Sequence, residues 1–367
     1  MSEIVKIFLE LAKIPSPSKK ERPVAEYIKN YLAKYPTIEV LEDRTGQKID
    51  GNCGNLIVKI PGGSPHILFD AHMDTVAPCD AINPQLKNGV ITSDGTSILG
   101  ADDKSGLALM LALIDHLMTD DFPHPTCTFL FTVCEEQSLM GAKLLEQKYL
   151  DSVDYIYVLD GEGPIGTAVV KTPHGCKGTL KVIGKEAHAG VCPEEGINAF
   201  VVAAEAVSAL SIGRIDGETT CNIGVAQGGT VTNVVMGELS LQFEARSFSP
   251  QKLEELTNHV KETFARVCQQ YGAQFEETLQ LGTPGYQLAD TVPILTAFKK
   301  ACEHEAVVYQ GAACGGGSNA NVYRMRGINA VNLSTNMQNI HSVNEQIAAA
   351  DLEKMLAVLK QLLQKVN

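Results

Sequence analysis

The sequence lacks an excess of basic residues, a membrane-length apolar run and a recognisable secretory signal. It has 30 Lys and Arg residues against 43 Asp and Glu residues, and the formal charge of -13 argues against nucleic acid or an anionic membrane surface as a partner. The apolar run Leu107–Ile114 is far too short to cross a bilayer. The N-terminus has no basic region followed by an apolar core. These absences together predict a cytoplasmic protein.

The ten cysteines include no C-x-x-C pair, and several of them, such as Cys127 and Cys134, lie in apolar runs. This pattern predicts reduced, buried thiols and argues against disulfides or a zinc ribbon. No repeat or low-complexity segment is apparent. The glycine-rich segment Gly311–Ser318 lacks the Gly-Lys-Ser/Thr ending of a phosphate-binding loop, so a nucleotide site of that type is not expected.

The pattern of apolar residues divides the chain into two kinds of region. A length of 367 residues predicts about two domains. Over 1–174 and 284–367, helical and strand patterns alternate, which is typical of an α/β domain. Over 175–283 the order approaches a ferredoxin-like α+β layer, so we expect an inserted domain, with one large mixed sheet as the alternative. The strands expected in this segment are 179–183, 220–225, 230–235, 238–245 and 274–279.

Acidic residues follow the apolar strands of the first region. A strand ending near Phe69 leads into Asp70-Ala71-His72-Met73-Asp74, a second leads into Glu135-Glu136 and a third ends at Asp160. Asp102 and Asp103 stand immediately before a helical stretch. Because ligands of open α/β sheets bind at the carboxyl ends of strands, we expect these acids to converge on one pocket. Carboxylates so close together repel one another, and bound cations would relieve that repulsion.

His72 and Asp74 are two residues apart, which places them on one side of an extended chain. A histidine that binds metal usually gives its second ring N–H to such an acid, so this pair indicates a ligand and its orienting group. Each acidic motif also has a plainer interpretation. His72 and Asp74 could be a polar strand end, Asp102 and Asp103 could cap a helix, and Glu135-Glu136 could form a solvated turn.

The motifs Asp70-Ala71-His72-Met73-Asp74, Gly100-Ala101-Asp102-Asp103-Lys104, Glu135-Glu136, Asp160 and His341, in this order, resemble those of metallopeptidase family M20, and within it the peptidase T (aminotripeptidase) group. The resemblance runs over essentially the whole chain. It implies a zinc-exopeptidase-like catalytic domain, α/β with a mixed sheet flanked by helices, formed by 1–174 and 284–367. It also implies that 175–283 is a ferredoxin-like α+β lid and dimerisation domain.

The resemblance further implies two Zn²⁺ ions per subunit, for which Mn²⁺ or Co²⁺ could substitute. Asp102 would bridge both ions, His72 and Asp160 would complete one site, and Glu136 and His341 would complete the other. Glu135 corresponds to the general base of the family, and Asp74 to the acid beside the histidine ligand. Relatives have a cis peptide bond between the two acids of the Asp-Asp pair, so we expect one between Asp102 and Asp103.

In the inserted domain, His188 corresponds to a residue that helps to hold the oxyanion, and Asn233 and Arg246 correspond to positions that bind the carboxylate end of the substrate. A surface histidine, a turn asparagine and a strand-edge arginine are the plainer interpretations. The chain also departs from the family pattern. Cys314 stands where peptidase T relatives carry an arginine, and Ser318 stands where an aspartate is expected, which argues against strict tripeptide specificity.

We therefore expect a zinc-dependent exopeptidase, an aminopeptidase that acts on di- and tripeptides and forms a homodimer. An N-acyl-amino-acid amidohydrolase or carboxypeptidase of the same family is the first alternative, because it would use the same metals on another small amide. A non-catalytic binding protein is the more remote alternative. Its sequence would have lost metal ligands, and this chain retains all of them.

Overall fold

The computed structural model describes residues 1–364 and divides into two compact units. Unit 1 consists of Met1–Val170 together with the chain from Gln287 onward, and unit 2 consists of Lys171–Tyr286. The sequence predicts an inserted segment at 175–283. Each unit has its own sheet and its own hydrophobic core, and each is described by itself below.

Unit 1 is built on a sheet that contains, within residues 1–364, nine strands in the order β1-β2-β6-β3-β7-β17-β8-β15, with β16 paired to β8. Its four central strands run parallel: β3 (Gly63–His72), β6 (Pro125–Thr132), β7 (Tyr155–Glu162) and β17 (Asn329–Met337). The outer strands are β1 (Val40–Glu42), β2 (Leu56–Ile60), β8 (Thr167–Thr172), β15 (Tyr286–Gln287) and β16 (Gln310–Ala313). A separate small sheet is formed by β4 (Gln85–Lys87), β5 (Val90–Thr92) and β18 (Gln346–Ala348).

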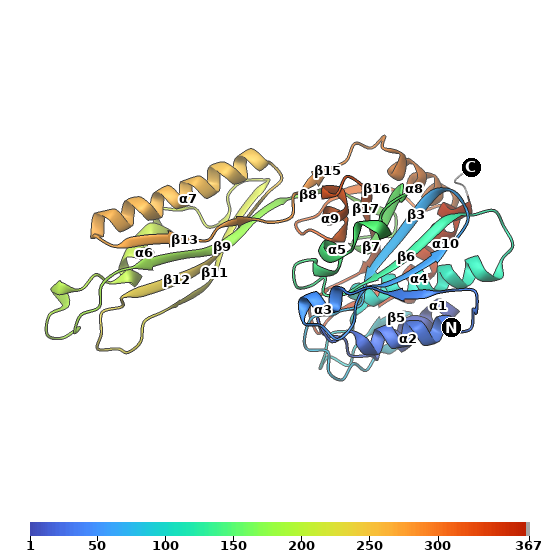
Figure 1. Ribbon diagram of the computed structural model, residues 1–367, viewed down its shortest axis with the longest axis horizontal. Coiled ribbons are helices and arrows are strands. Elements are labelled where there is room, and N and C mark those ends of the chain that lie inside the picture. The colour runs from blue at the N-terminus through green and yellow to red at the C-terminus, as the bar shows by residue number, and fades with distance from the viewer. Residues whose placement is uncertain (365–367) are drawn as a thin grey trace. The chain divides into compact units, whose positions relative to one another are not determined.

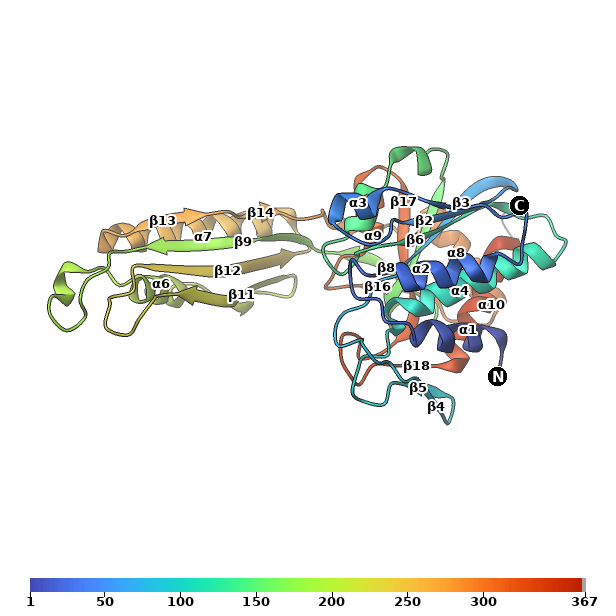
Figure 2. The ribbon, with the colours of Figure 1, turned by 60° about the horizontal axis from the view of Figure 1, so that its bottom comes forward.

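Helices cover both faces of this sheet (Figures 1 and 2). On one face α4 (Ala101–Thr119) packs against β3, β7 and β17, and α1 (Glu3–Ala12) and α10 (Ala349–Gln364) pack against α4. On the other face α9 (Asn319–Met325) packs against β7 and β17. The remaining helices are α2 (Arg22–Leu32), α3 (Thr45–Ile49), α5 (Met140–Leu144) and α8 (Pro293–His304). The expected α/β class, with a mixed sheet flanked by helices, is confirmed.

The centre of the sheet is apolar because its strands are covered on both sides. Ile67, Leu68 and Phe69 of β3 are all buried, as expected for a strand with helices above and below it. Phe69 stacks on Phe129 of β6 and on Tyr157 of β7, with ring centroids 5.5 Å and 5.9 Å apart. This packing fixes the three strands side by side, so that their carboxyl ends open at one edge.

Unit 2 has an antiparallel sheet in the order β10-β11-β12-β9-β13, with β14 paired to β9. Its two helices, α6 (Ala199–Ser208) and α7 (Pro250–Tyr271), both pack on one face of the sheet. The strands are β9 (His174–Ile183), β10 (Gly213–Arg214), β11 (Thr219–Gly228), β12 (Glu238–Ser247), β13 (Gln274–Glu277) and β14 (Gln280–Leu281). A core of aliphatic side chains and Phe243 and Phe264 lies between sheet and helices.

The predicted strand 230–235 is wrong. These residues form a turn between β11 and β12, and their pairing is limited to an isolated bridge between Val234 and His188. Val231 in this segment is exposed. The run is rich in β-branched residues, but it has no neighbouring strand in the described chain, and a strand forms only where its backbone groups find a partner.

Two general expectations can be compared with the structure. All ten cysteines are free thiols, and all of them except the half-buried Cys192 and Cys314 are buried. Over residues 1–364, the structure contains no helix that combines the length and the apolarity needed to cross a bilayer.

Candidate metal and catalytic centre

The parallel strands of unit 1 deliver the predicted site residues to one edge of the sheet. His72 is the last residue of β3, and Glu135 and Glu136 come just after β6. Asp160 lies near the end of β7, and His341 follows β17. Asp102 is at the beginning of α4. The five predicted ligands therefore come from five separate segments that the fold brings to one place.

The contacts between these side chains form two groups that share Asp102. His72 Nε2 lies 3.0 Å from Asp102 Oδ1 and 3.8 Å from Asp160 Oδ1. His341 Nε2 lies 3.0 Å from Asp102 Oδ2 and 3.0 Å from Glu136 Oε1. Each oxygen of Asp102 thus faces a different imidazole. All five residues lie together, and their role as metal ligands stays a prediction.

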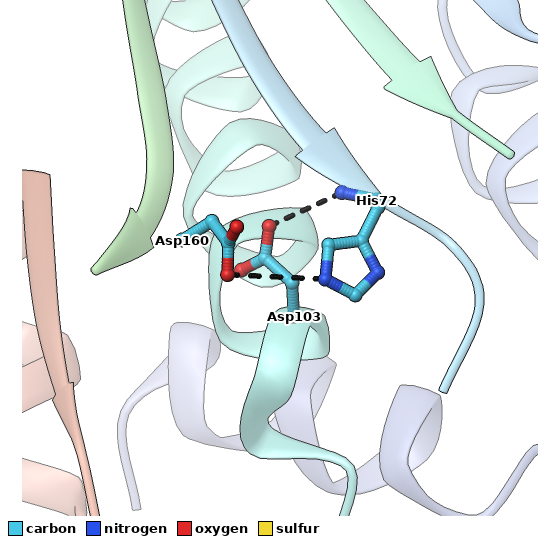
Figure 3. Close-up of side chains that lie close together, drawn as sticks. All are labelled: His72, Asp103 and Asp160. Atoms are coloured by element: carbon cyan, nitrogen blue, oxygen red, sulfur yellow. Dashed lines mark hydrogen bonds and ion pairs between the residues drawn. The ribbon is translucent and has the colours of Figure 1, made fainter. Parts of the chain in front are cut away.

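Asp103, which the sequence analysis did not propose as a ligand, also lies in this cluster. Ligand atoms of His72, Asp103 and Asp160 all lie within 4.8 Å of one another, as do those of His72, Asp102 and Glu136. Figure 3 shows the His72 ring and the Asp160 carboxylate facing each other, with Asp103 beside them. The two Asp103 oxygens accept the backbone N–H groups of His72 and Gly106, each at 3.1 Å.

The capping and the metal interpretations of the Asp-Asp pair therefore apply to different residues. Asp103 accepts the N–H of Gly106 three residues later, which is the bond of a helix cap. Asp102 instead faces the two histidines. The peptide bond between Asp102 and Asp103 is cis, which confirms the expectation drawn from the resemblance.

The chemistry of this cluster suits divalent cations. Two imidazoles and several carboxylates converge; Asp102, Asp103 and Glu135 are buried, and the side chains of Asp160 and Glu136 are only 12% exposed. Lys104 is buried close by in the chain, but its ammonium group donates to the carbonyl oxygen of Ile14 at 2.5 Å. Buried carboxylates in this number need positive charge beyond two imidazoles. Imidazole nitrogen and carboxylate oxygen are ligands for zinc, and manganese or cobalt also accept them.

The pKa values show how strongly the groups interact. Although burial opposes ionisation of Asp102, hydrogen bonds from His341 and His72 hold its pKa below the ordinary value. The same contacts with Asp102 and Glu136 raise the pKa of His341 to about 10. Burial, and then the charges of Asp102 and Glu135, raise the pKa of Asp160 well above its ordinary value. Without cations, the centre holds protons in their place.

Glu135 lies beside both groups but belongs to neither set of mutually close ligand atoms. It is buried, and this burial raises its pKa to about 8, with Glu136 and Asp102 adding to the rise. Its backbone N–H donates to Asp74 Oδ1 at 2.9 Å, and the N–H of Glu136 donates to Asp74 Oδ2 at 3.2 Å. Asp74 therefore holds the backbone of both glutamates.

The expected contact between Asp74 and His72 differs in detail from the prediction. The nearest partner of His72 Nδ1 is the backbone carbonyl oxygen of Asp74 at 2.8 Å, and the Asp74 carboxylate is 3.4 Å away. The reason is that β3 ends at His72, so the chain turns and no longer keeps the two side chains on one face. The carboxylate is free to accept N–H groups from the turn after β6.

Sequence reasoning missed two residues that hold the site. Glu345 is buried and accepts the backbone N–H groups of Leu99, Gly100 and Asp102, at 2.9, 2.6 and 2.9 Å. Asn332 exchanges two hydrogen bonds with the backbone of Asp160, at 3.0 and 2.9 Å. Asn332 could have been found, since it is a polar residue within the apolar run of β17. Nothing in the local sequence marks Glu345.

The three residues predicted in unit 2 do not all lie together within that unit. His188 and Asn233 are neighbours, because the N–H of Ala189 donates to the carbonyl oxygen of Asn233 at 2.9 Å. Arg246 lies near the far end of β12, and it forms an ion pair with Glu244 at 2.6 Å. It lies eight positions after Glu238 along this strand, a span of roughly 26 Å.

The two departures from the family pattern lie at the start of α9 in unit 1. Cys314 is half-buried, and its sulfur accepts the N–H of Gly316 at 3.4 Å. Ser318 is the residue before α9, and its N–H donates to Asn321 Oδ1 at 3.2 Å. Neither residue brings a charge to this loop.

The chain is similar to known peptidases over most of its length. A family model described as peptidase family M20/M25/M40 matches residues 68–365. The crystal structure of aminopeptidase PepT from Bacillus cereus shares 38% sequence identity and a TM-score of 0.89, covering 98% of this chain and 97% of that chain. A tripeptidase structure from Staphylococcus aureus shares 32% identity and a TM-score of 0.93, with the same coverage. Peptidase T of Halothermothrix orenii is 28% identical over 77% of this chain and 70% of its own length.

The raised pKa values predict how the metal-free protein responds to pH. Burial raises the pKa of Glu21 and of Glu345 to about 7, against 4.5 for a free glutamate. A carboxyl group whose pKa is higher in the folded state binds more protons there, so the free energy of unfolding falls as pH rises through this interval. The raised pKa values of Glu135 and His341 likewise make the free energy of unfolding fall as pH rises, and their effect extends to higher pH. The lowered pKa of Asp102 affects the free energy of unfolding only below about pH 3.8, the ordinary pKa of an aspartate.

We therefore expect the free energy of unfolding of the chelator-treated protein to decrease from pH 5 to pH 9. For a buried carboxyl group, a tenfold change in its acid dissociation constant on folding corresponds to about 1.4 kcal/mol. Urea denaturation at several pH values measures the trend, and the same series with added Zn²⁺ is the control, in which the cations replace the protons and the decrease becomes smaller. A metal-free protein whose stability is constant or increases over this range would contradict the prediction.

Proposed function

The chain belongs to peptidase family M20, and from this membership and the paired donor groups of unit 1 we propose that it is a zinc-dependent exopeptidase that hydrolyses short peptides. The observation that carries the proposal is the position of Asp102, whose two oxygens each lie 3.0 Å from the Nε2 atom of a different histidine. A carboxylate in this position can be shared by two cations. A hydrolase with a two-cation centre is what the donor set supports best.

We assign one ion to His72, Asp102 and Asp160, and the other to His341, Asp102 and Glu136. Asp103 lies close enough to His72 and Asp160 to join the first group, but both of its oxygens already accept backbone N–H groups. Zn²⁺ is the proposed metal, and Mn²⁺ or Co²⁺ suit the same donors. When bound, such cations polarise the peptide carbonyl group and lower the pKa of water.

Glu135 is the proposed general base. Its carboxylate takes a proton from the attacking water and returns that proton to the nitrogen of the leaving amine. Burial keeps the pKa of Glu135 high, at about 8, which suits a group that must both accept and return a proton near neutral pH. Asp74 accepts the backbone N–H of Glu135 and so holds it in position beside the donor groups.

The substrate class is proposed from the relatives. The Bacillus cereus protein is an aminopeptidase, and the Staphylococcus aureus protein is a tripeptidase. We propose that this chain removes an N-terminal residue from di- and tripeptides. Cys314 offers no positive charge to a substrate carboxylate where an arginine was expected, so we propose a broader length preference than that of a strict tripeptidase.

A panel of peptides tests the function directly. Free di- and tripeptides, the same peptides with an acetylated N-terminus and the same peptides with an amidated C-terminus are incubated with the protein and Zn²⁺. We expect the free and amidated peptides to lose their N-terminal residue and the acetylated ones to remain intact. Cleavage of the acetylated substrates alone would replace the aminopeptidase proposal with an N-acyl-amino-acid amidohydrolase. Protein that binds no metal and cleaves no amide would favour a binding protein.

We also propose that unit 2 is a lid and dimerisation domain, in which His188 helps to hold the oxyanion and Asn233 and Arg246 bind the carboxylate end of the substrate. A homodimer is supported by the outer edge of β11. In the described chain β10 pairs with only Thr220 and Cys221 of that edge. Val225 of β11 is 52% exposed. An open strand edge that carries an exposed apolar residue favours pairing with another chain.

Removal of the general base should separate activity from metal binding. We expect Glu135→Ala to lower kcat by about 10²–10⁴ because the proton of the attacking water loses its acceptor. The variant should still bind two Zn²⁺ ions, because Glu135 belongs to neither donor group. Steady-state kinetics and metal analysis of the dialysed protein measure the two properties. If zinc is lost together with activity, Glu135 is a ligand.

The dimer proposal predicts that a charge in β11 separates the subunits. In Val225→Lys each subunit would bring a lysine to the paired edge, and like charges close together across paired strands are unfavourable. Light scattering after gel filtration should show twice the chain mass of 39.4 kDa for the wild type and the single mass for the variant. Leu281→Lys, at an exposed site on β14, is the matched control and should remain dimeric. A monomeric wild type would refute the proposal.

A further inference from the structure

A buried glutamate that belongs to neither donor group contacts the turn that carries Glu135. Glu21, the residue before α2, is fully buried. Its Oε1 atom accepts the backbone N–H of Cys134 at 3.0 Å and that of Lys19 at 2.9 Å. The bond to Cys134 joins residues 113 positions apart. One of the two bonds is therefore local, and the other ties Glu21 to the turn after β6.

Cys134 is the residue at which the chain changes direction before Glu135. Its φ angle is +54°, in the left-handed region that a residue with a Cβ atom adopts only at a cost in free energy. This conformation follows the end of β6 at Thr132 and directly precedes Glu135 and Glu136. A conformation that costs free energy persists only where surrounding contacts hold it.

Two carboxylates provide those contacts. The three consecutive N–H groups of Cys134, Glu135 and Glu136 donate to Glu21 Oε1, Asp74 Oδ1 and Asp74 Oδ2. Asp74 is itself held by the hydroxyl of Ser18 at 2.7 Å. Ser18 and Glu21 belong to one segment, which is tied to the chain after Asp74 by the bond from Thr75 N to Ser16 O at 2.9 Å. The segment between α1 and α2 thus holds this turn, through Glu21 directly and through Ser18 and Asp74.

We propose that Glu21 is a positioning residue for the general base: its carboxylate fixes the left-handed turn at Cys134 and thereby the direction of the Glu135 side chain. The inference rests on the proposed function, because Glu135 acts as a base only if the chain hydrolyses amides. A glutamate that merely filled the core would affect folding but would not select one backbone conformation next to the reacting group.

Four variants test the role of Glu21. Glu21→Ala removes the acceptor of the Cys134 N–H. Glu21→Gln keeps a side-chain oxygen of the same reach. Glu26→Ala, at an exposed position on α2, is the control for an acid removed five residues further along the chain. Cys134→Gly supplies a residue that adopts positive φ without cost, so the turn needs less support.

We expect Glu21→Ala to lower kcat by about tenfold to 10²-fold, because a small displacement of the base is enough for such a loss. KM and zinc content should stay close to those of the wild type. Glu21→Gln should keep kcat close to the wild-type value, unlike Glu21→Ala, and Glu26→Ala should leave kcat unchanged. In the Cys134→Gly background, Glu21→Ala should cost clearly less than in the wild type, which shows that its effect passes through this turn.

A second measurement does not depend on activity. Amide hydrogen exchange in the zinc-loaded protein without substrate should be faster at Cys134 in Glu21→Ala than in the wild type, and unchanged in Glu26→Ala. A wild type that cleaves no peptide would refute the proposed function, while the exchange rate would still decide whether Glu21 holds the turn. Wild-type kcat in Glu21→Ala, no rescue by Glu21→Gln, loss of zinc in Glu21→Ala, or unchanged exchange at Cys134 would overturn the inference.

Discussion

The site depends on hydrogen bonds from backbone N–H groups to buried side-chain oxygens. Four of the five predicted ligands have their own backbone N–H held in this way, and the acceptor always comes from a different segment of the chain. The pairs are His72 with Asp103, Asp102 with Glu345, Glu136 with Asp74, and Asp160 with Asn332. Because a backbone N–H has one direction, each bond restrains the orientation of the backbone from which the ligand side chain extends. The ligand geometry is therefore set by the backbone and not only by packing around the side chains.

The same arrangement explains why the centre suits cations. A buried acid costs free energy unless hydrogen bonds satisfy it, and the N–H groups meet part of that cost. They do not meet all of it, since burial still raises the pKa of Glu345 to about 7 although it accepts three N–H groups. Protons or divalent ions must supply the remaining positive charge. The acids that hold the ligands in place thus also create the demand for metal.

The sequence predicted those elements and site residues that a local pattern of residues is enough to identify. Strand ends marked by acids at Asp70, Glu135 and Asp160 indicated the parallel sheet, and the rule for carboxyl ends then predicted that these residues converge. Glu21 and Glu345 could not be found in this way, because their partners lie 113 and 243 or more residues away. The prediction of a strand at 230–235 was wrong for the opposite reason. Its local pattern is that of a strand, but no neighbouring strand pairs with it in the described chain.

The two parts of the proposed function differ in how firmly the fold fixes them. The residues assigned to metal binding and proton transfer lie in unit 1, and most are buried and held by backbone bonds. Of the residues assigned to the substrate carboxylate, Asn233 is exposed and Arg246 is half-buried, and Arg246 is paired with Glu244 on the same strand. Exposed side chains change between relatives at little cost in stability, whereas a buried acid cannot change without leaving its N–H partner unpaired. Identity of 38% with the Bacillus cereus aminopeptidase therefore supports a shared reaction more strongly than a shared substrate, and the replacement of an expected arginine by Cys314 is the kind of change that this difference allows.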